Sequence, residues 1–140
     1  MSTEIKIELE KLFVDGLLSP PGVVESARDP SSPLHAHFDW DDTEAAEKWR
    51  HEQARQLIRS VKITISDASP VSVRAYVSLP VDRQSGAGYR RFEEVRDNEF
   101  LRRQLAADID QRIDGWQRQA LALGLAIDFA PITRQTKKLK

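Results

Sequence analysis

Apolar residues recur at helical spacing in the first part of the chain. Over residues 4–14 they follow steps of three and four, as one face of a helix does. We expect this helix to stop at Asp15-Gly16, because glycine accepts the left-handed geometry that ends many helices. Ser19 is a typical N-cap, and the two prolines after it suit the first turn of a short helix over 20–27. The pattern therefore predicts two helices joined by a turn.

A helix, a turn and a second helix together are compatible with a DNA-reading helix-turn-helix. A recognition helix normally offers several basic or amide side chains to phosphates and base edges. Residues 20–27 contain none, and Arg28 is the single base at their end. The composition favours a plain helical hairpin.

A longer amphipathic helix follows, from Asp41 or Asp42 to about residue 60. Either aspartate can accept backbone N–H bonds as the N-cap, and the acidic residues of the first turn suit the positive end of the helix dipole. Apolar residues recur along one face and basic residues lie mostly outside it. We expect this helix to cover the apolar face of a sheet.

The spacing changes at Val61 from helical to alternating. Apolar and polar residues alternate over 61–65 and again over 71–79, with a short turn between them, which predicts an antiparallel hairpin. We expect a loop over 80–88 and a short third strand over 89–92. The β part is therefore a hairpin or a three-stranded meander.

A long C-terminal helix begins near Asp97 and ends near Gly124. Its narrow apolar stripe follows steps of four and three, so this helix either packs on the sheet or pairs with a second copy. The segment 125–129 is compatible with a further helical turn or a short strand. The fold class is therefore α+β, with one domain over 1–132 and a basic, flexible tail over 133–140.

The amino-acid composition excludes several classes of function. The chain has 140 residues, 21 basic and 22 acidic, and a formal net charge of −1, so the whole molecule does not attract polyanions or anionic lipid. It contains no cysteine, which excludes disulfides, thiolate metal sites and cysteine nucleophiles. No apolar run approaches the roughly 20 residues that cross a bilayer, and the N-terminus lacks the order of a secretory signal. We expect a cytoplasmic protein that needs no cofactor and does not bind membranes.

The near-neutral balance hides an asymmetry. Residues 1–60 hold 7 Lys/Arg and 12 Asp/Glu, a net of −5, whereas residues 61–140 hold 14 and 10, a net of +4. The two parts can attract each other within the fold or between neighbouring copies. A basic surface in the second part is equally compatible with the count.

Three groups of strings carry a resemblance to a known family. They are SPLH at 32–35 with FDWDD at 38–42, then AA at 45–46 with QARQLIR at 53–59, then RAYVSL at 74–79 with DR at 82–83 and YR at 89–90. In this order and approximate spacing, the chain resembles a family of small uncharacterised proteins from tailed bacteriophages and prophages. The resemblance implies a phage or prophage origin and a location inside the host cell. It implies no reaction and transfers no catalytic residue.

The segment 35–42 contains ligand types for a divalent metal. His35 and His37 could hold zinc or manganese on an extended segment, with Asp39 or the more distant His51 completing the site. The spacing does not by itself bring these side chains together. The competing interpretation is that the aspartates cap the following helix while the aromatic residues pack on the body of the protein.

Two further surfaces are candidates for binding. The first is an arginine-rich surface with aromatic faces, which suits phosphate and single-stranded bases or an acidic protein. Internal pairing with Asp82, Glu93, Glu94 and the acidic N-terminal part is the alternative. Its residues are Arg74, Tyr76, Arg83, Tyr89, Arg90 and Arg91. The second is the apolar stripe of the long helix, and its self-association residues are Leu105, Ile109, Ile113 and Trp116.

These observations lead to three hypotheses about function. The first is a non-enzymatic phage or prophage protein that acts by self-association or by contact with another phage or host protein. The second is a nucleic-acid-associated accessory protein that uses the arginine surface. The third is a metal-dependent enzyme centred on the segment 35–42.

Overall fold

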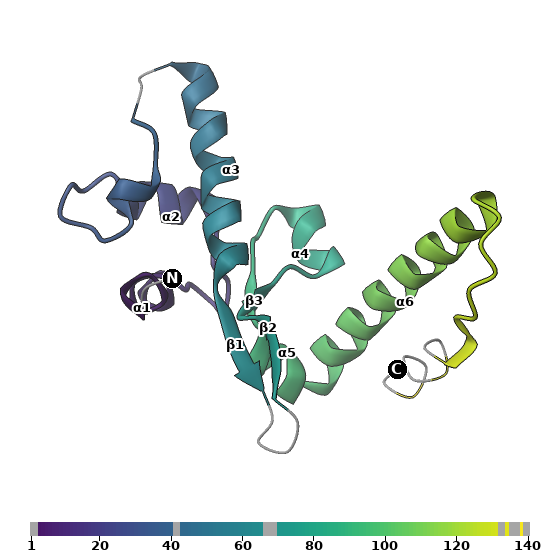
Figure 1. The fold of residues 1–140 in the computed structure, drawn as a ribbon. Coiled ribbons are helices and arrows are strands. Elements are labelled where there is room, and N and C mark those ends of the chain that lie inside the picture. The colour runs from purple at the N-terminus through teal and green to yellow at the C-terminus, as the bar shows by residue number, and fades with distance from the viewer. Residues whose placement is uncertain (1–2, 41–42, 66–69, 132–133, 135–137, 139–140) are drawn as a thin grey trace. The chain divides into compact units, whose positions relative to one another are not determined.

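The computed structural model describes residues 3–40, 43–65, 70–131, 134 and 138. Contacts divide the chain into two compact units, Met1–Phe92 and Glu93–Lys140. The first unit holds helices, two small sheets and the core, and the second holds the long helix (Figure 1). The fold class is α+β, as predicted. One domain over 1–132 stays a prediction, which a single cooperative unfolding transition would support.

Eleven elements follow one another along the described chain. In order they are α1 (Thr3–Lys11), α2 (Pro20–Ala27), the 3₁₀ turn η1 (His35–His37), α3 (Glu44–Ser60), β1 (Lys62–Ile65), β2 (Val71–Arg74), β3 (Tyr76–Val77), α4 (Pro80–Ser85), β4 (Arg90–Arg91), α5 (Phe92–Asp97) and α6 (Glu99–Ala122).

The helix caps confirm one prediction and correct another. Ser19 caps α2, since its hydroxyl accepts the Gly22 N–H at 3.2 Å. The N-cap of α3 is Thr43, whose hydroxyl accepts the Ala46 N–H at 3.2 Å, and not Asp41 or Asp42. Those two aspartates lie outside the described residues, and Thr43 is the better-placed acceptor because it immediately precedes the first helical residue.

The Asp15-Gly16 pair forms a tight turn and does not cap α1, which ends earlier, at Lys11. Both residues have positive φ, 50° and 76°, and the flanking Val14 and Leu17 exchange two backbone hydrogen bonds of 2.9 Å. Asp-Gly suits such a two-residue turn, in which both central residues need positive φ.

The predicted hairpin is present, but its second strand is divided at Ala75. β1 pairs antiparallel with β2, whereas β3 pairs with β4 in a separate two-stranded sheet. Ala75 donates its N–H to Val61 O at 2.9 Å and accepts the Phe92 N–H at 2.8 Å. The chain therefore changes pairing partner at this residue, and the described strands form two sheets in place of a three-stranded meander.

The loop expected over 80–88 contains a short helix, α4. Pro80 occupies its first turn, which suits proline because the missing N–H would have had no partner there. Gly86 ends α4 with φ 69° and donates its N–H to Arg83 O. The sequence features that mark α4 are therefore Pro80 at its start and Gly86 at its end. Proline and glycine are also typical of loops, so the same residues led to the prediction of a loop.

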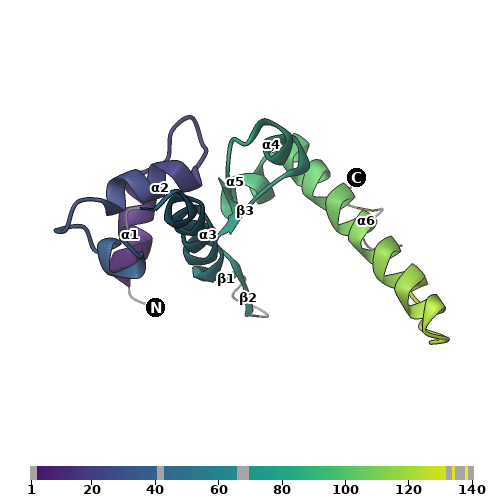
Figure 2. The ribbon, with the colours of Figure 1, turned by 90° about the horizontal axis from the view of Figure 1, so that it is seen from above.

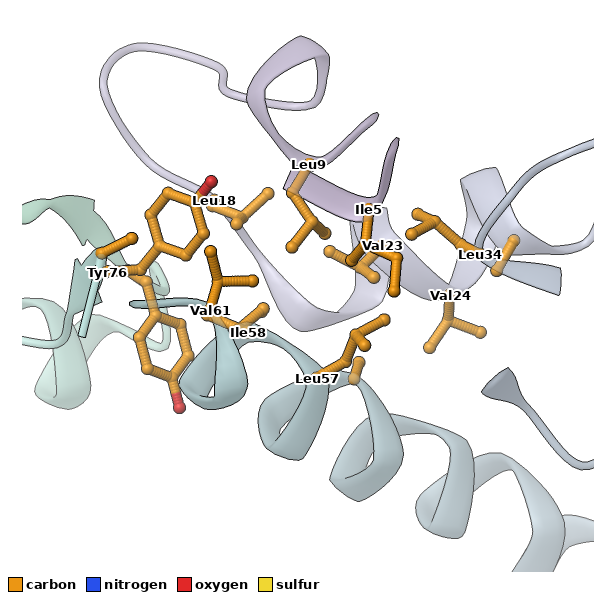
Figure 3. Packing of buried hydrophobic residues seen from close by; sticks show 14 of the residues in the cluster. Ile5, Leu9, Leu18, Val23, Val24, Leu34, Leu57, Ile58, Val61 and Tyr76 are labelled. Carbon is orange, nitrogen blue, oxygen red and sulfur yellow. The ribbon is translucent and has the colours of Figure 1, made fainter. Parts of the chain in front are cut away.

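In the first unit, α1, α2 and α3 lie together (Figure 2), and the core joins these helices to the start of the strands (Figure 3). Ile5 and Leu9 of α1, Val23 and Val24 of α2, and Ile58 of α3 are at most 4% exposed. The other members of this core cluster are Leu18, Ala27, Leu34, Phe38, Ala54, Leu57, Val61, Ala75, Tyr76 and Tyr89.

The second unit consists mainly of α6, whose ends match the sequence signals. Asn98 caps it by accepting the Leu101 N–H at 3.0 Å, and Gly124 follows its last turn with φ 75°. The segment 125–129 is neither helix nor strand. Part of the predicted tail, at 133, 135–137 and 139–140, lies outside the described residues. Among the described helices, none is both long and apolar enough to cross a membrane.

Candidate functional site

The arginine surface is partly assembled by the β3–β4 pair. Its register places Tyr76 opposite Arg91 and Val77 opposite Arg90. The two tyrosine rings belong to the core, however, since Tyr76 is 1% exposed and Tyr89 is 7% exposed. Neither ring offers a face on which a base can stack.

Arg91 and Tyr76 meet at one carboxylate from α1. The Tyr76 hydroxyl donates to Glu10 Oε1 at 3.0 Å, and Arg91 Nε donates to Glu10 Oε2 at 2.7 Å. The Arg91 guanidinium carbon also lies 3.7 Å from the centre of the Phe13 ring, a cation–π arrangement. Burial and the hydrogen bond to Glu10 raise the pKa of Tyr76 above its usual range. This cluster ties α1 to the β3–β4 sheet.

Arg90 is held by a buried carboxylate of α4. Its Nε and Nη2 donate to the two carboxylate oxygens of Asp82, both at 2.7 Å, the two-point geometry that matches guanidinium to carboxylate. Asp82 is 3% exposed. Arg83, by contrast, is exposed, and its Nη1 donates to Ser78 O at 2.7 Å. Of the predicted surface residues, Tyr76, Arg90 and Arg91 are thus each bonded to a carboxylate within the fold.

Arg74 lies apart from that sheet, on β2. It is exposed and stands directly opposite Lys62 of β1. Lys62 was not among the predicted site residues. The sequence pattern that points to it is the alternation of polar and apolar residues along the two strands. Lys62 and Thr64 are two residues apart, as are Ser72 and Arg74, so the four polar side chains share one face of the hairpin.

The His35–Trp40 segment is organised around the Trp40 ring. The His35 and Trp40 rings are stacked, 4.9 Å apart and inclined by 11°. Trp40 Nε1 donates to His35 O at 3.0 Å, and His35 Nδ1 lies 2.8 Å from Ala27 O. Phe38 packs beside Trp40 at 5.7 Å and is buried. These contacts anchor the segment on the end of α2.

Two arginines lie over the same ring and share the Glu47 carboxylate. Arg28 and Arg50 lie 5.8 Å and 5.5 Å from the centre of Trp40, and both donate to the Glu47 carboxylate. The bond from Arg50, followed by that from Arg28, lowers the pKa of Glu47. The bonds to Glu25 and Glu47 raise the pKa of Arg28. Arg50 Nη1 also donates to Asp39 O at 3.1 Å, which joins α3 to the loop before it.

The predicted metal ligands are not gathered in the described part of the chain. His35 faces a backbone carbonyl, and His37 and Asp39 are exposed. No three His, Asp or Glu side chains of the described residues come together as a metal would require.

The predicted self-association residues lie on α6 with unequal exposure. Leu105 is half-buried and Ile113 is buried, while Ile109 is 37% exposed and Trp116 is 60% exposed. Leu123, directly after the helix, is 76% exposed. The second unit therefore presents large apolar side chains to solvent.

The comparisons with known proteins add no further constraint. No protein-family model, curated protein or solved structure matches this chain. The geometry of the described residues is therefore the basis for the functional argument.

Proposed function

We propose that this chain is a small non-enzymatic phage or prophage protein that acts by protein–protein interaction, in the first place by self-association through α6. The observation that carries the proposal is the exposure of Ile109, Trp116 and Leu123, which follow one another at seven-residue steps along the apolar stripe. The resemblance of the segments around residues 32–59 and 74–90 to tailed-phage proteins supports the origin, and with it the host cytoplasm as the site of action.

The stripe has the spacing of a helix-pairing seam. From Ala106 to Leu123 the apolar positions follow steps of three, four, three, four and three, which is the repeat of a two-helix coiled coil. They are Ala106, Ile109, Ile113, Trp116, Ala120 and Leu123. Alternate members are buried at 3%, 5% and 8%, while Ile109, Trp116 and Leu123 are the exposed ones. A second copy of α6 would cover those three side chains.

The exposed apolar area of Trp116 is large enough to contribute to association when a second copy covers it. A tryptophan buries roughly 150–250 Å² on full burial, and apolar area contributes about 25 cal/mol per Å². With 60% of Trp116 exposed, its covering would contribute on the order of 2–4 kcal/mol to each copy before the cost of association. Trp116 is therefore the residue whose removal should disrupt the assembly most.

Sedimentation velocity over a range of concentrations tests the proposal. We expect the wild-type chain to form a species of at least twice the 15.9 kDa monomer mass, and Trp116→Glu to sediment as the monomer. Phe100→Glu is the matched control, because Phe100 is 66% exposed on the same helix but lies off the stripe. Circular dichroism is the check that both variants keep their helix. A wild-type chain that stays monomeric at high concentration and captures no phage or host protein would refute the proposal.

A further inference from the structure

The β1–β2 hairpin has one wholly polar face. Its register places Lys62 opposite Arg74 and Thr64 opposite Ser72. Residues directly opposite each other in an antiparallel pair share a face, and alternate residues along a strand share it too. All four side chains are exposed, whereas Ile63 on the other face packs against the core cluster.

The two cations on this face repel each other. Like charges directly opposite on neighbouring strands destabilise a hairpin. Within the described part of the chain, neither Lys62 nor Arg74 forms an ion pair or a side-chain hydrogen bond. Arg90 and Arg91 on the other sheet are each neutralised by a carboxylate. Asp67, in the segment that connects the strands, lies outside the described residues. An external anion would relieve the repulsion between Lys62 and Arg74.

We propose that this polar face binds the phosphate backbone of duplex DNA. Lysine and arginine neutralise phosphates, and threonine and serine hydroxyls donate hydrogen bonds to phosphate oxygens. The face offers both kinds of group side by side, two cations and then two hydroxyls. A two-stranded ribbon also fits the major groove, which is roughly 12 Å wide.

The composition of the face favours nucleic acid over an acidic protein. The centres of protein interfaces are depleted in lysine and serine and are organised around aromatic or apolar anchors. The polar face of the described hairpin carries no such anchor. The first unit as a whole holds 12 Lys/Arg and 14 Asp/Glu over residues 1–92, a net of −2. Binding must therefore come from the local pair of cations and be sensitive to salt.

The experiment measures fluorescence anisotropy of a labelled duplex with the full-length chain, from roughly 50 to 200 mM salt. The observed association constant should fall linearly with salt on a log–log plot. Because each neutralised phosphate contributes a slope of about −0.9, the double variant Lys62→Gln with Arg74→Gln should make the slope shallower by about 2. The matched control is Lys48→Gln with Arg118→Gln, which removes one lysine and one arginine from exposed helix positions and should leave the slope unchanged.

A second variant tests the hydroxyls without changing the charge. Thr64→Val with Ser72→Ala should lower affinity several-fold at one salt concentration and keep the wild-type slope. Three results would overturn the proposal: no binding of the wild-type chain at low salt, an equal loss of slope in the two charge variants, or displacement of the duplex by poly-aspartate as effective as by unlabelled duplex. The last result would indicate an acidic protein as the partner. This test does not depend on α6, so it stands or falls separately from self-association.

Discussion

The Asp82–Arg90 pair tests whether the arginines of the β3–β4 sheet stabilise the fold or are available to a ligand. The Asp82 side chain is 4% exposed and the Arg90 side chain is 23% exposed, with both hydrogen bonds at 2.7 Å. Removing one partner of a buried pair leaves the other charge buried and typically costs 3–5 kcal/mol. Because Arg90 keeps about a quarter of its contact with solvent, we expect Asp82→Asn to lower the free energy of unfolding by about 3 kcal/mol.

A double-mutant cycle with urea unfolding measures this energy. Arg90→Gln should also destabilise, and the double variant should cost about 2 kcal/mol less than the sum of the two single changes. Asp97→Asn is the control: Arg96 Nε lies 2.7 Å from Asp97 Oδ1, as in the buried pair, but both side chains are exposed. We expect it to leave the free energy of unfolding close to the wild-type value, because solvent screens this exposed pair. If Asp82→Asn costs no more than Asp97→Asn and the coupling is absent, Arg90 is not held by the fold and is available to a ligand.

Two further predictions concern the core. Because the pKa of Tyr76 is raised in the folded state, its hydroxyl loses the proton at lower pH in the unfolded chain than in the folded one. The contribution of the protonated hydroxyl to stability is therefore complete below about pH 10. Above that pH the free energy of unfolding should fall by up to about 1.4 kcal/mol per pH unit. Urea unfolding between pH 9 and pH 11 should show this excess pH dependence in the wild type relative to Tyr76→Phe, and parallel profiles would contradict it. Gly88 has φ 114°, and a Cβ there would lie 2.2 Å from Leu18 O, so Gly88→Ala should destabilise by several kcal/mol in thermal unfolding. Gly86→Ala, with φ 69° and open space around its Cβ, should cost only about 1–2 kcal/mol, and equal costs at the two positions would refute the steric argument.

Local signals were sufficient for α1, α2, α3 and α6 and for the approximate positions of the strands. The Ser19 cap and the glycine after α6 act through neighbours in sequence, so they could be predicted without knowledge of the fold. α4 was missed because its short Pro-to-Gly segment has the composition of a loop. The N-cap of α3 was misplaced by one or two residues because aspartate and threonine are both good caps and the choice depends on where the first turn begins.

The candidate sites required the tertiary structure. Arg90 and Arg91 look alike in the sequence, which left both a binding surface and internal pairing with Asp82 and the acidic N-terminal part open. Their partners, Asp82 and Glu10, are eight and 81 residues away, and only the packing of α1 and α4 brings the carboxylates to them. The contacts of the Trp40 ring with His35 and two arginines likewise depend on the packing of α2, α3 and the loop that joins them.

The sequence by itself determined the α+β class, the order of most elements and the apolar stripe of α6, because caps, glycine turns and hydrophobic periodicity are properties of neighbouring residues. Only the tertiary structure decided which charges are neutralised. The net charge of −1 does not show which charged groups lie next to each other. In the fold, Arg90 is paired with Asp82, whereas the register of the hairpin places Lys62 opposite Arg74. The reason is physical, since the energy of a charge depends on what lies within a few ångströms of it, and the fold chooses those neighbours.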